Sequence, residues 1–136
     1  MSLEENKDLV RQYCAAMSHD GDLAALDAIC APAFAHLNDD LAHLKATMVL
    51  ARTGFPDLRF AVEDLIAERD RVWLRWSLHG THLGEFLGTP ATGKVIELED
   101  LFNIFRIANG KLRDTTPHWG CQYAKLFEQI GAAPPA

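Results

Sequence analysis

Residues 58–78 decide the fold class and read Leu-Arg-Phe-Ala-Val-Glu-Asp-Leu-Ile-Ala-Glu-Arg-Asp-Arg-Val-Trp-Leu-Arg-Trp-Ser-Leu. Apolar side chains recur at nearly every second position on both sides of Arg69-Asp70, a pair that favours a turn. Alternation of this kind is typical of strands with one buried face, so the stretch predicts a long antiparallel hairpin. The alternating positions, each set predicted to share one face of its strand, are Leu58, Phe60, Val62, Asp64 and Ile66 in the first strand and Val72, Leu74, Trp76 and Leu78 in the second.

Three helical patterns precede this hairpin. Ser2 and Glu5 form a capping-box pattern that begins a helix over residues 3–18. A second short amphipathic helix is predicted over residues 23–30 and ends before Pro32. The third begins after Asn38 and stops at residues 54–56, where the sequence reads Gly-Phe-Pro.

Strand patterns follow the hairpin. Residues 80–93 are rich in glycine and predict a loop, residues 95–107 and 111–119 predict two strands joined by Asn109-Gly110, and residues 125–130 predict a short helix. This order predicts a single α+β domain over residues 1–131 and a frayed tail at 132–136. Helices packed on one face of a strongly bent antiparallel sheet leave a hollow, which is the default ligand site.

Composition narrows the function classes. The 136 residues carry a net charge of −6 without a cluster of Lys or Arg, so nucleic acid is not an expected partner. The acidic N-terminus and the absence of a long apolar run predict a cytoplasmic protein without a membrane span. Cys14, Cys30 and Cys121 are widely separated, which indicates reduced thiols and no metal site.

The loop segment Gly80-Thr-His-Leu-Gly-Glu-Phe-Leu-Gly-Thr-Pro-Ala-Thr-Gly93 resembles a motif of SnoaL-like proteins, the polyketide or ester cyclase relatives within the nuclear transport factor two-like superfamily. Other segments support the resemblance across the chain. They are Phe55-Pro-Asp-Leu58, Ile104-Phe-Arg-Ile107, Asn109-Gly-Lys-Leu112 and Glu128-Gln-Ile-Gly131.

The resemblance implies a cone-shaped α+β barrel, in which three N-terminal helices pack on the curved sheet around an internal apolar pocket. It also implies a homodimer formed through the sheet. The best understood relatives close a polyketide ring by an intramolecular aldol reaction without a cofactor, using an Asp as general acid and base. The leading hypothesis is therefore a cofactor-independent enzyme acting on a small to medium apolar carbonyl compound.

The sequence departs from the family pattern at this Asp. Counting forward from Lys111 places it at Gly120, and counting back from Gly131 places it at Gln122. The two counts differ by two residues, which predicts a local insertion around residues 115–118. The nearest acid on the same predicted strand is Asp114.

Two histidines are candidates for acid/base work. The family usually carries a cavity-facing His at the position of His36, although a structural histidine under the third helix is the alternative reading. By alternation, His118 shares a face with Leu112, Asp114 and Thr116. If that face lines the cavity, His118 could replace the missing Asp; otherwise it lies on an edge or a bulge marked by Pro117.

Asn103 stands three residues before Arg106, where ketosteroid isomerases, distant relatives of this fold, carry an oxyanion-binding acid. Its amide can donate a hydrogen bond to a carbonyl without titrating; the alternative is a buried side chain paired with the neighbouring strand. Glu97 and Glu99 share its face by alternation, so at least one is expected at the cavity mouth or an interface.

Other residues are expected to shape the pocket. His82 is predicted to hold the loop, with ligand contact as the alternative, and a metal site formed by His79, His82 and His118 is rejected because no ligand spacing supports it. The predicted ligand-binding side chains are Tyr13, Met48, Phe55, Phe60, Trp76, His82, Leu101 and Phe105.

Two rival functions remain open. The missing Asp favours a non-catalytic protein that binds a hydrophobic metabolite or supports a partner through its sheet. The pair Asp114 and His118 would instead suit a hydrolase or dehydratase that activates water.

Overall fold

The computed structural model describes residues 2–132. Most of the expected tail at 132–136 therefore lies outside the described residues. The helices are α1 (Leu3–Met17), the 3₁₀ helix η1 (Leu23–Ala25), α2 (Leu26–Ile29), α3 (Leu41–Gly54) and α4 (Gln122–Ile130). The strands are β1 (Cys30–His36), β2 (Asp39–Asp40), β3 (Arg59–Glu68), β4 (Arg71–Thr81), β5 (Val95–Ala108) and β6 (Lys111–His118).

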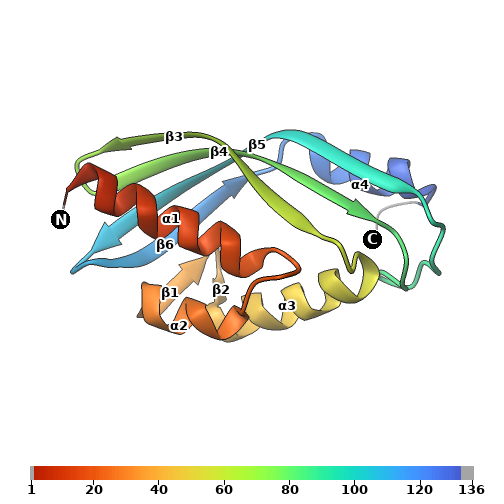
Figure 1. The fold of residues 1–136 in the computed structure, drawn as a ribbon, viewed down its shortest axis with the longest axis horizontal. Coiled ribbons are helices and arrows are strands. Elements are labelled where there is room, and N and C mark those ends of the chain that lie inside the picture. The colour runs from red at the N-terminus through yellow and green to blue at the C-terminus, as the bar shows by residue number, and fades with distance from the viewer. Residues whose placement is uncertain (1, 133–136) are drawn as a thin grey trace.

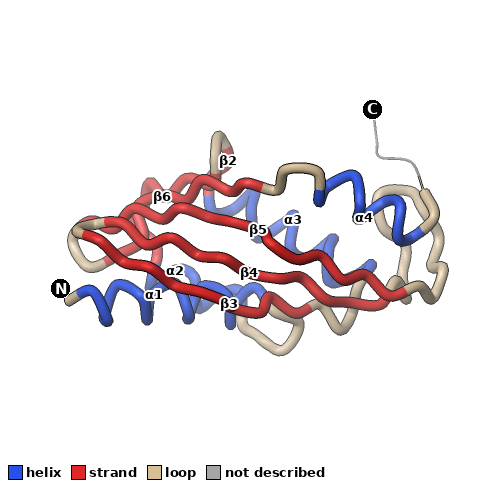
Figure 2. Tube along the Cα trace, turned by 90° about the horizontal axis from the view of Figure 1, so that it is seen from above, coloured by secondary structure: helices blue, strands red, loops and turns tan. Residues whose placement is uncertain are grey.

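The six strands form one curved sheet in the order β2-β1-β6-β5-β4-β3, which does not close into a barrel. Figure 1 shows α1, α2 and α3 on one side of this sheet, with α4 beside the first residues of β5. Figure 2 looks onto the opposite face, which no helix covers in the described part of the chain. The predicted α+β, cone-shaped architecture is confirmed. None of the helices within residues 2–132 is long and apolar enough to span a membrane.

The region after α1 differs from the prediction. The second helix is short, and the chain then forms β1, which pairs in parallel with β6, so the sheet is mixed rather than antiparallel. Pro32 lies inside β1 instead of ending a helix. It falls where the β1–β6 register shifts, between Cys30 and Ala35, and a proline is tolerated at such an irregularity because a regular ladder hydrogen bond is not required there.

Three register shifts interrupt the long strands. They leave an extra residue at Glu63 in β3, at Glu99–Asp100 in β5 and at Arg113 in β6. Such bulges bend a strand, which lets the sheet curve around the helices. Each bulge also reverses which residues face inward for the rest of the strand.

The bulges correct part of the predicted inner face. In β4 the inward set is confirmed, because Val72, Leu74, Trp76 and Leu78 are all buried. In β3, beyond Glu63, Leu65 and Ala67 pack against the core, whereas Ile66 is 65% exposed. The predicted unbroken alternation is therefore wrong, because Asp64 and Ile66 do not share the face of Leu58 and Phe60.

Arg52 fixes α3 against the end of α1. Its guanidinium donates hydrogen bonds to the backbone oxygens of Ser18, at 2.6 Å, and Gly21, at 3.1 Å. The capping box at Ser2 and Glu5 is confirmed at the other end of α1. The Arg52 hydrogen bonds join α3 to the chain at the C-terminal end of α1.

Candidate functional site

The space between the helices and the sheet contains a pocket with two adjoining compartments, called here the interior pocket. The inner compartment has a volume of about 120 Å³ and the outer one about 400 Å³. They adjoin because six residues line both: His36, Thr47, Met48, Phe60, Pro117 and Trp119. Together they extend from the core beneath α1 to the surface near α4.

The outer compartment has apolar walls. Phe60 and Leu78 come from the sheet, Met48 and Ala51 from α3, Phe55 from the C-terminal end of that helix, and Phe86 and Leu87 from the loop after β4. Tyr123 and Leu126 of α4 complete the wall. Apolar walls of this kind suit an apolar ligand, whose burial supplies affinity without directing chemistry.

The inner compartment carries the polar groups. Trp76 Nε1 donates a hydrogen bond to Asn103 Oδ1 at 2.9 Å, and Asn103 Nδ2 donates to Thr115 Oγ1 at 2.9 Å. An indole N–H can only donate, so the Asn103 oxygen must face Trp76 and the amide nitrogen must face the other way. This leaves the second N–H of Nδ2 for a ligand, in a side chain that lines the compartment.

His36 lines both compartments from β1. It pairs in register with Thr115 of β6, which also accepts the Asn103 hydrogen bond from β5. Thr115 pairs in register with Phe105, and Asn103 pairs with Pro117. The backbone of Asn103 therefore lies two strands across from His36 and two residues further along the sheet, at a distance of about 12 Å. Burial lowers the pKa of the His36 imidazole, opposed by the Asp39 carboxylate, so the ring is neutral at neutral pH.

Tyr13 and Cys14 of α1 line the inner end. Burial raises the pKa of the Tyr13 hydroxyl and raises the pKa of the Cys14 thiol to about 12. Both groups therefore stay protonated at neutral pH and can act only as neutral hydrogen-bond donors or acceptors.

The structure brings together five of the eight side chains predicted to bind ligand: Tyr13, Met48, Phe55, Phe60 and Trp76. Leu101 and Phe105 point inward but lie wholly within the core and do not line the pocket. His82 is fully buried beneath the loop, where its Nδ1 lies 2.9 Å from Thr92 Oγ1. The structure therefore supports the loop-holding reading of His82.

Leu112 does not share a face of β6 with Asp114, Thr116 and His118, as alternation predicted. Because Arg113 is an extra residue, Leu112 and Thr115 face the core, whereas Asp114, Thr116 and His118 face the uncovered side of the sheet. Neither Asp114 nor His118 lines the interior pocket. Pairing with β5 continues through Pro117 and His118, so no bulge occurs at residues 115–118.

The bulge in β5 has the same effect on the two glutamates. Asn103 faces inward, as expected, but Glu97 and Glu99 are exposed on the uncovered face. Gln129 of α4 pairs with the backbone of Glu97, at 2.9 and 3.0 Å. No carboxylate lines the interior pocket in the described part of the chain.

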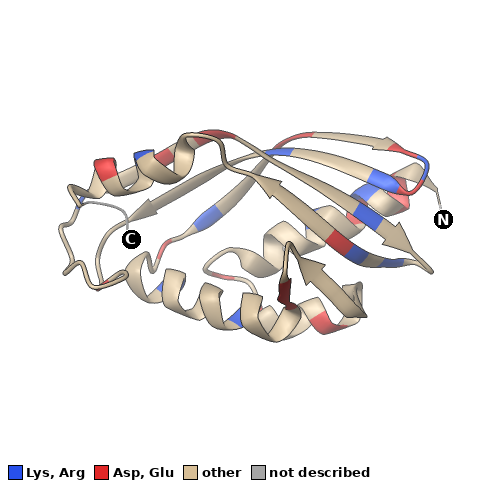
Figure 3. Ribbon diagram, turned by 180° about the vertical axis from the view of Figure 1, so that it is seen from behind, with Lys and Arg blue, Asp and Glu red and all other residues tan. Residues whose placement is uncertain are grey.

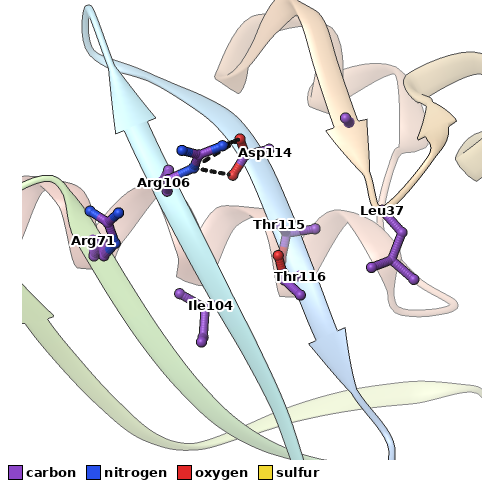
Figure 4. Close-up of a pocket in the computed structure, with 8 residues that line it drawn as sticks. Leu37, Arg71, Ile104, Arg106, Asp114, Thr115 and Thr116 are labelled. Atoms are coloured by element: carbon purple, nitrogen blue, oxygen red, sulfur yellow. Dashed lines mark hydrogen bonds and ion pairs between the residues drawn. The ribbon is translucent and has the colours of Figure 1, made fainter.

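A second hollow, of about 460 Å³, lies on the uncovered face (Figure 4). Arg106 donates through Nε to both carboxylate oxygens of Asp114, each at 3.0 Å, and this contact raises the pKa of Arg106. Figure 3 shows charged residues of both signs on the strands at this end of the sheet. The hollow is open and its carboxylate is already paired, so the interior pocket is the better candidate site.

Sequence reasoning missed the pocket residues Thr47, Pro117, Trp119 and Tyr123. Trp119 lies edge-on to Trp76, with ring centroids 5.8 Å apart, and Tyr123 packs edge-on to Trp119 at 6.3 Å. The aromatic residues around the start of α4 were the available signal. Their position over the pocket depends on how the chain turns after β6, which no local pattern specifies.

Comparison with known proteins finds a matching family model and related cyclases. A family model described as SnoaL-like polyketide cyclase matches residues 7–130. Over 72 residues the chain is 33% identical to the aklanonic acid methyl ester cyclase DnrD of Streptomyces peucetius, covering 52% of this chain and 48% of that protein. The match thus spans about half the length of this curated relative.

Solved structures resemble the whole chain. AclR, a putative hydroxylase from Streptomyces galilaeus, is 27% identical with a TM-score of 0.83, covering 99% of this chain and 86% of that one. TsrD from Streptomyces laurentii is 25% identical with a TM-score of 0.84, covering 97% and 98%. With the family model matching most of the chain, this protein belongs to the SnoaL-like polyketide cyclase family.

Proposed function

We propose that this protein is a cofactor-independent acid/base enzyme that acts on an apolar carbonyl compound, as in an aldol-type cyclisation. One observation carries the proposal: a neutral histidine and an amide N–H of fixed orientation line the same inner compartment at the end of an apolar pocket. Proton removal next to a carbonyl requires a base and a donor to the developing oxyanion, and these two groups supply both.

In the proposed reaction, the neutral His36 ring takes a proton from the carbon next to the carbonyl. The electron pair of that C–H bond moves to the carbonyl oxygen, which the free N–H of Asn103 stabilises. The resulting enolate carbon attacks a second carbonyl of the same molecule and forms the new C–C bond. The new alkoxide then recovers the proton from the His36 imidazolium, so the base returns to its starting state.

The environment supports these roles. Burial lowers the pKa of His36, which keeps the base unprotonated at neutral pH. The neutral hydroxyl of Tyr13 is a further donor in the same compartment. Trp76 prevents the Asn103 amide from turning its oxygen toward the substrate, because that would leave the indole N–H unpaired.

Hydrogen–deuterium exchange at the methyl group of 2-acetylnaphthalene tests the proposal, since this apolar ketone exchanges through its enolate. In D₂O we expect the protein to accelerate exchange, and we expect His36→Gln or Asn103→Leu to reduce the acceleration about 100-fold. His43→Gln is the matched control, because His43 is an exposed histidine on α3 that does not line the pocket. Loss of exchange in His118→Gln, with His36→Gln unaffected, would contradict the assignment.

The second candidate is a protein that binds an apolar ligand without turning it over. The absence of a carboxylate among the lining residues of the described chain favours it. Saturable binding of the same ketone, with exchange no faster than in buffer, would establish this alternative and reject the catalytic one.

A further inference from the structure

Two leucines adopt an unusual backbone conformation. The non-glycine residues with positive φ in the described chain are Leu37 (55°), Arg69 (54°), Leu87 (46°), Asp100 (55°) and Asn109 (52°). Asp and Asn tolerate this left-handed region, whereas Leu37, Arg69 and Leu87 each lie in a two-residue turn between paired backbone segments. The turns account for the positive φ. A leucine is strained there by its side chain, so the choice of leucine instead of Asn or Gly is what requires an explanation.

Both leucines line the outer compartment of the interior pocket. Leu37 lies in the turn between β1 and β2. It also lines the second hollow, and Figure 4 shows its side chain at that turn. Leu87 lies in the loop between β4 and β5, fifty residues later in the chain. Their side chains are 57% and 51% exposed, so each stands at the surface while also bordering the cavity. Two strained segments that are far apart in the sequence thus each place a leucine at the opening of the pocket.

The loop fixes Leu87 in this place. Phe86 and Thr89 exchange two backbone hydrogen bonds, of 3.0 and 2.9 Å, around Leu87 and Gly88. Both turn residues have positive φ, the arrangement for which Asn-Gly is the favoured sequence. The base of the loop is anchored where Leu83 N and Gly84 N each donate to Gly54 O at 3.1 Å.

Two further exposed apolar side chains border the same opening. Leu50 of α3 is 59% exposed and Tyr123 of α4 is 46% exposed, and both line the outer compartment. We call these four residues the rim: Leu37, Leu50, Leu87 and Tyr123. Asn103 and Tyr13 lie at the opposite, inner end of the pocket, and His36 lines both compartments. The pocket therefore has polar side chains in its inner compartment and apolar side chains at its rim.

We propose that Leu37 and Leu87 are specificity-determining residues that hold the apolar end of an elongated carbonyl compound, which enters with its carbonyl first. This inference rests on the proposed function, which places the carbonyl at Asn103. This role explains why leucine is present despite the backbone strain. Asn or Gly would relieve the strain but would remove the apolar contact with the ligand. A ligand reaching the rim buries apolar surface that is otherwise exposed to water.

Two probes distinguish ligand contacts at the rim from contacts in the inner compartment: 2-acetylnaphthalene and its 6-hexyl derivative. Binding is followed by quenching of tryptophan fluorescence, since Trp76 and Trp119 line the pocket. We expect Leu37→Asn and Leu87→Asn each to raise the melting temperature by about 3 °C, because Asn relieves the backbone strain. We expect the double variant to lose about tenfold in affinity for the hexyl probe and less than twofold for the short probe.

Leu83→Asn is the matched control, since Leu83 is 59% exposed in the same loop but has an ordinary φ and does not line the pocket. It should change neither the melting temperature nor the preference between probes. The proposal is overturned if the two rim variants do not gain thermal stability, if both probes lose affinity equally, or if the wild-type protein does not bind the hexyl probe.

A third ligand distinguishes failure of the rim from failure of the proposed function. In 2-ethyl-6-hexylnaphthalene the carbonyl is absent while the tail is kept. If this hydrocarbon binds as tightly as the hexyl ketone and still loses affinity in the rim variants, the rim holds the tail but the carbonyl role of Asn103 is wrong. If the ketone binds more tightly than the hydrocarbon, yet the rim variants are unaffected, the proposed function stands and the rim proposal is wrong.

Discussion

Replacing Trp76 and Asn103, singly and together, measures the hydrogen bond that orients the amide in the inner compartment. Both side chains are 4% exposed and the bond between them is 2.9 Å long. Asn103→Leu keeps the approximate size of the side chain but leaves the indole N–H buried without a partner, which costs about 1–3 kcal/mol of unfolding free energy. Trp76→Phe leaves the amide oxygen unpaired instead.

Trp76→Phe also removes ring contacts. Trp76 stacks on Phe60 with ring centroids 4.6 Å apart and lies edge-on to Trp119, so we expect a total loss of about 2–4 kcal/mol. The double variant leaves neither partner of the Trp76–Asn103 bond unpaired. Its loss should therefore be about 1–2 kcal/mol smaller than the sum of the single losses.

Urea unfolding followed by far-ultraviolet circular dichroism gives the four free energies. The control cycle combines Asn103→Leu with Trp73→Phe, which makes the same change on the opposite, exposed face of β4 and should be additive. Additivity within about 0.5 kcal/mol in the Trp76 cycle would refute the argument that this bond fixes the amide.

Two further predictions concern the base and the loop. The lowered pKa of His36 means that the unfolded chain binds its proton first as pH falls. The contribution of neutral His36 to stability is thus fully present above about pH 6.5 and is lost as the pH falls below that value. The urea midpoint should therefore fall less between pH 7 and pH 5 in His36→Gln than in the wild-type protein. An equal fall in both proteins would contradict the lowered pKa of His36. Gly84→Ala should lower the melting temperature by several degrees, since the added Cβ would lie 2.0 Å from the backbone oxygen of Thr53. Glu85→Ala, at the neighbouring position, is the control and should leave the melting temperature unchanged. Equal melting temperatures in the two variants would show that the loop moves to make room for the Cβ.

Local sequence patterns predicted most of the secondary structure. The capping box at Ser2, the turn at Asn109-Gly110 and the inward face of β4 all depend on interactions between near neighbours, and the structure confirms them. Alternation also placed Asn103 on the inner face, because β5 has no bulge between the β4-paired residues Leu101 and Phe105.

The candidate site was harder to predict because bulges have no strong local signal. A single extra residue, Arg113, moved Asp114 and His118 to the uncovered face, and Glu99–Asp100 did the same for Glu97. The short strand β1 was missed because its pairing partner lies far away in the sequence. Sequence patterns did not find the pocket residues whose positions depend on tertiary structure. His36 is the exception, because the family resemblance led us to expect it in the pocket.

The parallel pairing of β1 with β6 has a consequence for the order of folding. Strands β3 to β6 are joined one after another and can pair through short closures, whereas His36 pairs with Thr115, nearly eighty positions later. Closing so large a chain segment costs more conformational entropy, so we expect β1 to dock after the other strands have paired. On a ribosome, β1 must wait until β6 has emerged. The strand that carries Asn103 would then be in place before His36 arrives, and the pocket would gain its proposed base only after β5 and β6 have paired.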